Sequence, residues 1–254
     1  TVLGPDHPAT LQSMHNLAGS YFNVGRYADA LALSKKTLAL RQARLGADHP
    51  DTLTSLHGLA AAYNALGRHA DAAALLEDTL ARQKARLGPD HPAVLLTMKN
   101  LAEVYRRLGR DPDALRLREE TLARRTATFG ADHPDTLEAQ WDVIESLIAL
   151  KRPAEALPRI DALLVLADRT QAAGKRVDPR LAPQMFAYRA QLCREAKDAT
   201  GCRATAEQWE KRQPNDAKGL YDAACFRAIT AAVQAQTLGT ASAKKATDDA
   251  DKAI

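Results

Sequence analysis

The sequence predicts an all-α protein, built as a right-handed superhelical solenoid of antiparallel helix pairs. Hydrophobic residues make up 46% of the 254 residues and aromatic residues only 5%. The apolar content is therefore mostly alanine and leucine, which are strong helix formers. A five-residue pattern, Gly-x-Asp-His-Pro, also recurs every 42 residues, starting at Gly4, Gly46, Gly88 and Gly130. A fixed period of this kind is typical of repeat proteins, in which successive units stack side by side.

Each repeat is expected to begin with a first helix, which in the first repeat lies between Pro8 and Gly25. Asp6 and His7 suit a helix start because aspartate accepts hydrogen bonds from free backbone N–H groups, and Pro8 is tolerated in the first turn. Gly25 ends the helix, since a left-handed conformation costs glycine little. The apolar residues between these ends recur at three- and four-residue steps and form one stripe, made by Leu11, Met14, Leu17, Ala18 and Tyr21.

A second, longer helix is expected to follow the glycine, with an apolar face made by Ala28, Leu31, Leu38 and Leu45. The small residues Ala18 and Ala30 let the two helix axes approach closely. A single hairpin of this kind cannot cover both of its apolar faces. Each hairpin must therefore stack on the next, which leaves a concave surface lined by first helices.

A second recurring signature lies inside the repeats. The residues Leu17-Ala18, Tyr21, Gly25-Arg26 and Ala30 return at matching positions in the second and third repeats. The pattern Leu-Ala-x-x-Tyr-x-x-x-Gly-Arg-x-x-x-Ala resembles the tetratricopeptide repeat, in the 42-residue variety of the kinesin light chains, whose linkers read Leu-Gly-x-Asp-His-Pro. This resemblance implies an array that binds a protein or peptide partner.

The array is expected to cover residues 1–173 as four repeats, the last of them degenerate because Lys151 stands where glycine stood. Its first helix carries Trp141, Ile144 and Leu147. Residues 174–254 are predicted to continue the array as degenerate repeat-like helices. The expected elements are a hairpin of residues 178–197 and 204–211 with Gly201 in or near its turn, a helix over about 217–236, a loop over 237–245, and a last helix from about 248.

Both ends of the sequence suggest a longer parent chain. The start, Thr1-Val2-Leu3-Gly4, matches the end of a repeat and lacks an initiating methionine. Near the other end, Leu220-Tyr221-Asp222-Ala223-Ala224-Cys225 and Asp248-x-x-Asp251-Lys252-Ala253 resemble the tail of large bacterial serine/threonine protein kinases that carry tetratricopeptide arrays. This second resemblance implies an array that recruits substrates or regulators to a kinase domain ahead of Thr1.

Composition argues against several other classes of partner. The 35 basic and 31 acidic residues give a net charge of +4 and are mixed along the chain, which does not suit a nucleic-acid footprint. No apolar run reaches the roughly 18 residues of a membrane span, so no direct membrane contact by this segment is expected, although a parent chain can carry a span elsewhere. The three cysteines lack the regular spacing of a disulfide framework, which favours a reducing, cytoplasmic location. A solvated outer face is expected for Arg116, Arg118, Arg124 and Arg125.

No catalytic, metal or cofactor site is expected in this segment. The linker histidines belong to stacked repeats about 10 Å apart, whereas a tetrahedral zinc needs ligands at about 2.0 Å. Every histidine lies between His7 and His133 and the cysteines begin at Cys193, so a solenoid keeps nucleophile and base apart. The glycine-rich loop and the catalytic motifs of kinases are also missing.

The concave groove is the candidate site, because first-helix side chains opposite the packing stripe point into it. Asparagines there can pair with a peptide backbone, Lys99 and Arg106 can take acidic groups, and Trp141 can anchor an apolar side chain. By helical phase the groove residues are Gln12, His15, Asn16, Asn23, His57, Asn64, Lys99, Asn100, Glu103, Arg106, Trp141, Asp142 and Glu145.

The resemblance implies a similar use of the groove. Kinesin light chain repeats carry asparagine just before the Leu-Ala step and use it to hold peptide cargo; Asn16 and Asn100 match that position, while Gly58 and Asp142 replace it. An alternative function, that of a small-molecule-sensing or other enzyme-associated helical domain, requires a closed apolar pocket around Trp141 or Trp209 at the degenerate end.

Overall fold

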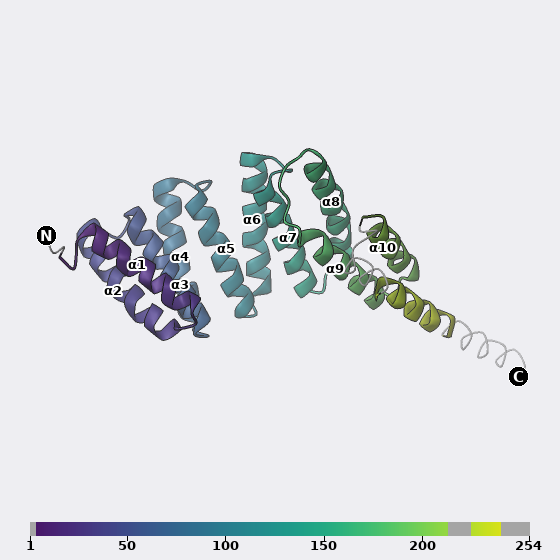
Figure 1. Ribbon diagram of the computed structural model, residues 1–254, viewed down its shortest axis with the longest axis horizontal. Helices are drawn as coiled ribbons and strands as arrows, with labels where there is room; N and C mark the ends of the chain where they lie inside the picture. The colour runs from purple at the N-terminus through teal and green to yellow at the C-terminus, as the bar shows by residue number, and fades with distance from the viewer. Residues whose placement is uncertain (1–3, 213–224, 240–254) are drawn as a thin grey trace, which may run out of the picture. The chain divides into compact units, whose positions relative to one another are not determined.

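A computed structural model describes residues 4–212 and 225–239 (Figure 1). Within those ranges all regular secondary structure is helical, which confirms the predicted fold class. The chain forms two compact units, an N-terminal unit of Thr1–Lys151 and a C-terminal unit of Arg152–Ile254. The predicted boundary of the repeat array, between residues 173 and 174, stays a prediction.

The N-terminal unit is a stack of helix pairs. Within this unit α3 and α5 each pack against the second helix of their own pair and against the second helix of the pair before, α1 packs on α2, and α7 packs on α6, so the predicted side-by-side order is confirmed (Figure 1). Because the residues that start and end the helices recur every 42 residues, equivalent helices have the same length from pair to pair. They are α1 (Pro8–Asn23), α2 (Tyr27–Leu45), α3 (Pro50–Ala65), α4 (His69–Leu87), α5 (Pro92–Arg107), α6 (Asp111–Phe129) and α7 (Pro134–Ala149).

The start of each first helix is capped by the linker histidine, whereas we predicted the aspartate. His7 is the N-cap residue of α1, and its Nδ1 accepts a hydrogen bond from the backbone N–H of Ala9 at 3.2 Å. The same bond recurs at 3.1 to 3.2 Å in α3, α5 and α7. An imidazole nitrogen accepts only when it carries no proton, so each capping histidine holds its proton on Nε2.

The linker aspartate has a different role from the predicted cap. The Asp6 carboxylate pairs with Arg44 near the end of α2, at 2.9 Å. Asp90 pairs with Arg124 of α6 at the same distance. In both cases the aspartate ties the linker to the second helix of its own pair, which helps to fix the direction in which the first helix begins.

The turn between the two helices of a pair follows the prediction. Gly25 has a φ of 80°, and the N–H of Arg26 donates to the Tyr21 carbonyl at 2.8 Å, which closes the end of α1. The Arg26 guanidinium stacks over the Tyr21 ring at 4.4 Å and pairs with Asp29 at 2.6 Å. In the fourth repeat Lys151 takes the same left-handed position, with a φ of 55°.

The packing faces differ from the prediction at four residues. Leu11 and Ala18 of α1 are buried as expected, but Leu17 is 45% exposed because no preceding helix packs on it in this structure. Ala28 is exposed because α2 buries a row that starts two residues later, at Ala30. Arg118 is 7% exposed and the Arg125 side chain only 12%, and both bond to α7, whereas we expected them on the solvated outer face.

The C-terminal unit contains α8 (Pro153–Ala172), α9 (Leu181–Glu195) and α10 (Ala199–Arg212), followed by helical residues 225–239. Lys197, with a φ of 55°, makes the turn of the predicted hairpin, and Gly201 lies in the first turn of α10. A Cβ at Gly201 would lie 2.8 Å from the Cys193 sulfur. Cys193 and Cys202 are buried in one cluster with Val233, as expected for small apolar residues between helices.

The last predicted elements are only partly described. Residues 225–236 are helical as predicted, and the helix continues through 237–239, where a loop was expected. The rest of that loop, the final helix from about 248, and all of the kinase-like tail except Cys225 lie outside the described residues.

Candidate functional site

The first helices of the N-terminal unit line a hollow of about 420 Å³. We call it the neutral hollow. Four predicted groove residues line it from three successive first helices: His15, Asn23, His57 and Asn100. The larger apolar surfaces come from Phe22 and Leu96, and the rest of the lining is mostly small, including Gly19, Thr54, Gly58 and Ala61.

Small residues explain why the hollow lies between α1 and α5. Gly19 and Ala61 occupy the repeat position that Glu103 holds in α5, so two long side chains are missing from this part of the wall. Gly58 occupies the position of Asn100, and a Cβ there would already lie 3.7 Å from the His15 ring. The absence of bulk at these three positions leaves the hollow open.

The four groove asparagines have different surroundings. Asn16 accepts a hydrogen bond from Gln12 at 2.9 Å, and Gln12 in turn accepts one from Arg41 at 2.9 Å. Asn64 contacts His69 Nδ1 at 2.7 Å. Within the described residues, the side-chain amides of the other two, Asn23 and Asn100, have no hydrogen-bond partner and stay available to a guest.

His57 is fixed in the wall of the hollow by a chain of short hydrogen bonds. Its Nε2 lies 2.6 Å from the Thr97 hydroxyl, and that hydroxyl lies 2.5 Å from Gln83 Oε1. Since Thr97 has one proton to give and the Gln83 oxygen accepts it, His57 donates from Nε2. Burial lowers the pKa of His57. For His15, burial and then the Arg41 charge lower the pKa, so both histidines favour the neutral form.

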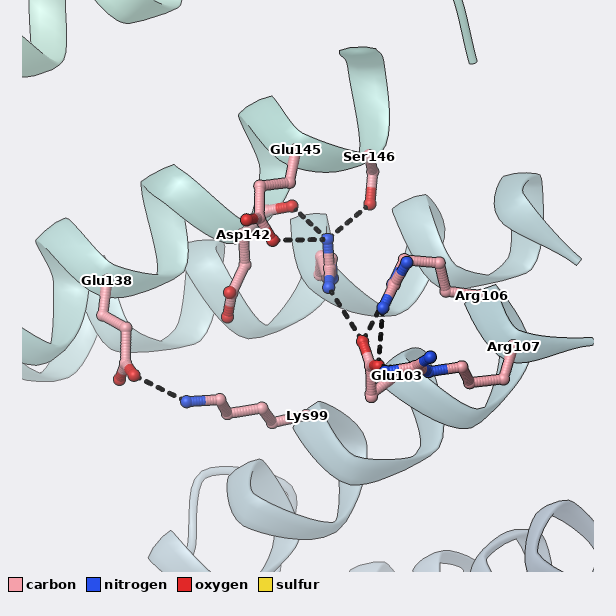
Figure 2. Close-up of polar contacts among 9 residues, drawn as sticks. Lys99, Glu103, Arg106, Arg107, Glu138, Asp142, Glu145 and Ser146 are labelled. Atoms are coloured by element: carbon pink, nitrogen blue, oxygen red, sulfur yellow. Dashed lines mark hydrogen bonds and ion pairs between the residues drawn. The ribbon is translucent and has the colours of Figure 1, made fainter. Parts of the chain in front are cut away.

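The groove continues into a different environment on α5 and α7, shown in Figure 2. We call this set the charged cluster: Lys99, Glu103, Arg106, Arg107, Arg118, Glu138 and Glu145. Lys99 pairs with Glu138 at 2.6 Å, and Glu103 pairs with Arg106 at 2.7 Å and with Arg107 at 3.0 Å (Figure 2). Lys99 and Arg106, which we expected to hold acidic groups of a guest, already have carboxylate partners.

Buried Arg118 bridges the helices that carry the charged cluster. Arg118 Nη1 donates to the Asp142 carbonyl at 2.6 Å and to the Ser146 hydroxyl at 3.0 Å. Its guanidinium also lies 3.8 Å from Glu103 and 3.7 Å from Glu145. These contacts join α6 to both α5 and α7, so the predicted groove residues Glu103 and Glu145 also serve the packing of the unit.

Two predicted groove residues on α7 do not suit the roles expected of them. Trp141 is 8% exposed and belongs to the core, which leaves little of the ring for a guest to contact. The Asp142 carboxylate makes no hydrogen bond or ion pair within the described residues. Burial raises the pKa of Asp142, so its charge is disfavoured where it stands.

Comparison with known proteins identifies the family. The sequence profile described as tetratricopeptide repeat matches three overlapping stretches, residues 10–85, 74–127 and 95–164. Together these matches cover more than half of the 254 residues. The chain belongs to the tetratricopeptide repeat family. No curated protein sequence matches it.

Solved structures share the fold of this tetratricopeptide repeat protein. The nearly identical repeats of a Podospora anserina protein, described as a kinesin light chain, are 27% identical over 91% of this chain and 98% of that one, with a TM-score of 0.63. BtubC from P. vanneervenii is 19% identical over 87% and 80%, with a TM-score of 0.67. A Rap protein complexed with competence and sporulation factor is 12% identical over 92% and 66%, with a TM-score of 0.55.

Several residues of the tetratricopeptide groove were missed in the sequence. Gly19, Ala61 and Leu96 line the neutral hollow, and Arg107 and Glu138 belong to the charged cluster. A comparison of equivalent positions from repeat to repeat contains the signal for the first two, because Gly19 and Ala61 are small where the third repeat has glutamate. Our choice of polar residues at the groove-facing helical positions overlooked the small residues at those positions.

The described residues hold few other candidate sites. They contain no group of three or more histidine, cysteine, aspartate or glutamate residues placed to hold a metal ion. None of their helices combines the length and the apolar character needed to cross a bilayer.

Among the described residues of the C-terminal unit lie hollows of about 370 and 310 Å³. The smaller one is lined by Trp209, the residue around which the alternative function requires a closed apolar pocket. Aspartates line both hollows, Asp161 and Asp168 in the larger and Asp168 and Asp178 in the smaller. Apolar residues also line both hollows, but the aspartates in each lining do not favour a purely apolar small-molecule site.

Proposed function

We propose that this tetratricopeptide repeat protein binds an extended segment of a partner protein in the groove formed by α1, α3 and α5. The observation that carries the proposal is the neutral hollow of about 420 Å³ between Asn23 and Asn100. Its volume and open shape suit a side chain of the guest together with the backbone beside it.

The chemistry of the wall supports a peptide as the guest. Asn23 and Asn100 each offer one donor group and one acceptor oxygen, which match the C=O and N–H of a peptide backbone. Phe22 and Leu96, the latter 48% exposed, offer apolar contact. His57 is held rigidly through Thr97, so little rotamer freedom is lost when a guest contacts it.

The charged cluster contributes to selectivity more than to affinity. Its cations and carboxylates already pair with one another at 2.6 to 3.8 Å. A charged guest must displace one of these partners, and the gain from the new pair is offset by the loss of the old one. We therefore place the main binding energy in the neutral hollow.

The proposal is tested with peptides selected from a random display library on the intact protein. A double variant, Asn23→Ala with Asn100→Ala, is expected to weaken binding of a selected peptide about tenfold or more, because two backbone-pairing groups are lost. Ala61→Glu, which copies Glu103 of the third repeat, is expected to fill the hollow and abolish binding. Isothermal titration calorimetry gives the dissociation constants.

The matched control is Gln42→Ala, an exposed amide on α2 outside the hollow lining. It should bind like the unaltered protein. Equal affinity for all the variants would contradict the groove assignment, provided that circular dichroism shows each variant to be folded.

We further propose that the segment is the interaction region of a larger cytoplasmic bacterial protein, such as a serine/threonine protein kinase. The support is the resemblance of residues 220–225 and 248–253 to the tails of such kinases. Reading the gene upstream of Thr1 tests this directly, and an upstream sequence without a kinase domain would contradict it.

A further inference from the structure

His57 carries a hydrogen-bond acceptor that a guest in the neutral hollow can reach. Its ring lines the hollow and is half-buried. Because Nε2 donates to Thr97, the other ring nitrogen, Nδ1, holds a lone pair and no proton. Within the described residues Nδ1 has no hydrogen-bond partner, and it is not one of their fully buried side-chain atoms without a partner. Nδ1 is therefore open to solvent or to a guest.

The tautomer of His57 is fixed by residues behind the wall. Thr97 is fully buried, and its hydroxyl lies 2.5 Å from Gln83 Oε1 and 2.9 Å from the Ala93 carbonyl. Both oxygen atoms are acceptors, so the hydroxyl proton points to them and Thr97 can only accept from His57. The residues at the position of His57 in the other first helices are His15, Lys99 and Trp141.

His15 supplies a second imidazole to the same hollow. Its ring lies beside α3, since its Cε1 is 3.7 Å from the place that a Cβ of Gly58 would occupy. Neither ring nitrogen has a hydrogen-bond partner within the described residues. Burial and then the Arg41 charge lower the pKa of His15, so the neutral ring offers one N–H donor and one acceptor.

The lining of the hollow selects against charged guest groups. None of the described residues in the lining carries a carboxylate, ammonium or guanidinium group. A guest lysine or arginine would be buried there without a counter-charge, and a guest carboxylate would bring acceptor oxygens toward the lone pair of His57. A hydroxyl is uncharged, has one proton to donate, and has an oxygen that accepts. It therefore matches Nδ1 of His57 together with the N–H of His15.

We infer that His57 selects a guest side chain with a hydroxyl group, that of serine, threonine or tyrosine; this inference rests on the peptide-binding function proposed above. The hydroxyl donates to His57 Nδ1 and accepts from His15, while Phe22 and Leu96 contact the carbon atoms of the guest. Phosphorylation of that hydroxyl removes the donated proton and adds a charge of about −2. Because the lining holds no cation, the phosphorylated guest is excluded.

The test uses the intact protein and a peptide selected from the display library. Each serine, threonine and tyrosine of the peptide is replaced by its counterpart without the hydroxyl, which is alanine, valine or phenylalanine. At one position the loss should weaken binding about tenfold or more in isothermal titration calorimetry, because the acceptor in the hollow loses its partner. The peptide phosphorylated at that position should bind about a hundredfold more weakly, or less tightly still.

His57→Phe keeps a planar ring and removes the acceptor. In this variant the preference for the hydroxyl peptide over its counterpart should fall from about tenfold to nearly none. His69→Phe is the matched control, because His69 lies outside the hollow lining, and it should keep the full preference. Circular dichroism shows whether both variants are folded.

Nitrogen-15 NMR of the histidine side chains gives a readout that needs no variant. His57 is expected in the Nε2–H form in the free protein, and its Nδ1 signal should move when the peptide binds. An Nδ1–H form would overturn the inference, as would a hydroxyl preference that survives His57→Phe or tight binding that needs no hydroxyl. These results would leave the proposed function standing, whereas a library without any binding peptide would contradict that function and the inference with it.

Discussion

The two ends of the N-terminal unit use the same helical positions for opposite purposes. On α1 and α3 the groove positions hold Gly19 and Ala61, which leave a hollow without charge. On α5 and α7 the same positions hold Glu103 and Glu145, which contact the buried Arg118 at 3.8 and 3.7 Å. The repeat fixes where a side chain points, whereas the residue type decides whether that position packs or stays open to a guest.

The largest expected effect concerns Arg118. Arg118→Ala should lower the free energy of unfolding by about 3 kcal/mol, because the Asp142 carbonyl and the buried Ser146 hydroxyl lose their partner and the half-exposed carboxylates of Glu103 and Glu145 lose a nearby cation. Arg118→Leu copies Leu76, the buried residue at the same position of α4, and should cost less. Urea denaturation measures both, with exposed Arg107→Ala as a control near zero. Equal losses for the two Arg118 variants would contradict this role.

A smaller effect is expected where the fourth repeat departs from the others. Lys151→Gly should raise the free energy of unfolding by about 1 kcal/mol, since a left-handed φ of 55° is costly for lysine. Lys36→Gly in the interior of α2 is the matched control and should lower stability by about 1 kcal/mol. Urea midpoints that move in the same direction for both variants would show that the turn is not strained.

Thr136 on α7 differs from Thr52, the residue at the same position of α3. Its hydroxyl is buried and has no hydrogen-bond partner within the described residues, whereas Thr52 donates to the Gly46 carbonyl at 2.9 Å. Thr136→Val, which copies Val94, should stabilise the protein by up to about 1 kcal/mol, and Thr52→Val should destabilise it by about 1 kcal/mol. Thermal unfolding measures both. A loss of stability in Thr136→Val would contradict the comparison.

The smallest expected effect is a change in pH dependence at the hollow. Burial lowers the pKa of His57 below the ordinary value of 6.5, so the unfolded chain takes up a proton at a higher pH than the folded protein does. Stability should therefore fall as the pH drops below about 6.5. His57→Gln keeps a donor for Thr97 and should reduce this fall, as measured by urea midpoints at about pH 7.5 and 5. If the His57→Gln variant shows the same dependence of stability on pH, a group other than His57 is responsible for that dependence.

The fold could be predicted from the sequence because its signals are local. Gly25 and the Tyr21 carbonyl end α1 within one turn of helix, and the 42-residue period repeats this helix end in later repeats. The histidine cap was missed because aspartate is the commoner cap and both residues stand at the helix start. The exposure of Leu17 was missed because periodicity within one helix does not show which neighbour covers each face.

The candidate site was predictable only as a surface. Helical phase placed His15, Asn23, His57 and Asn100 together, and all four line the neutral hollow. It could not show that Lys99 and Arg106 are already paired or that Trp141 is buried, because those facts depend on side chains from neighbouring helices. Which residues touch each other between repeats depends on how several helices pack, and the pattern within one helix does not show it.

The most direct test of the peptide-binding proposal is a crystal structure of the intact protein with a peptide selected from the display library. We predict a peptide side chain inside the neutral hollow and hydrogen bonds from its backbone to the amides of Asn23 and Asn100. A peptide bound on the outer face formed by the second helices, with the hollow empty, would contradict the account.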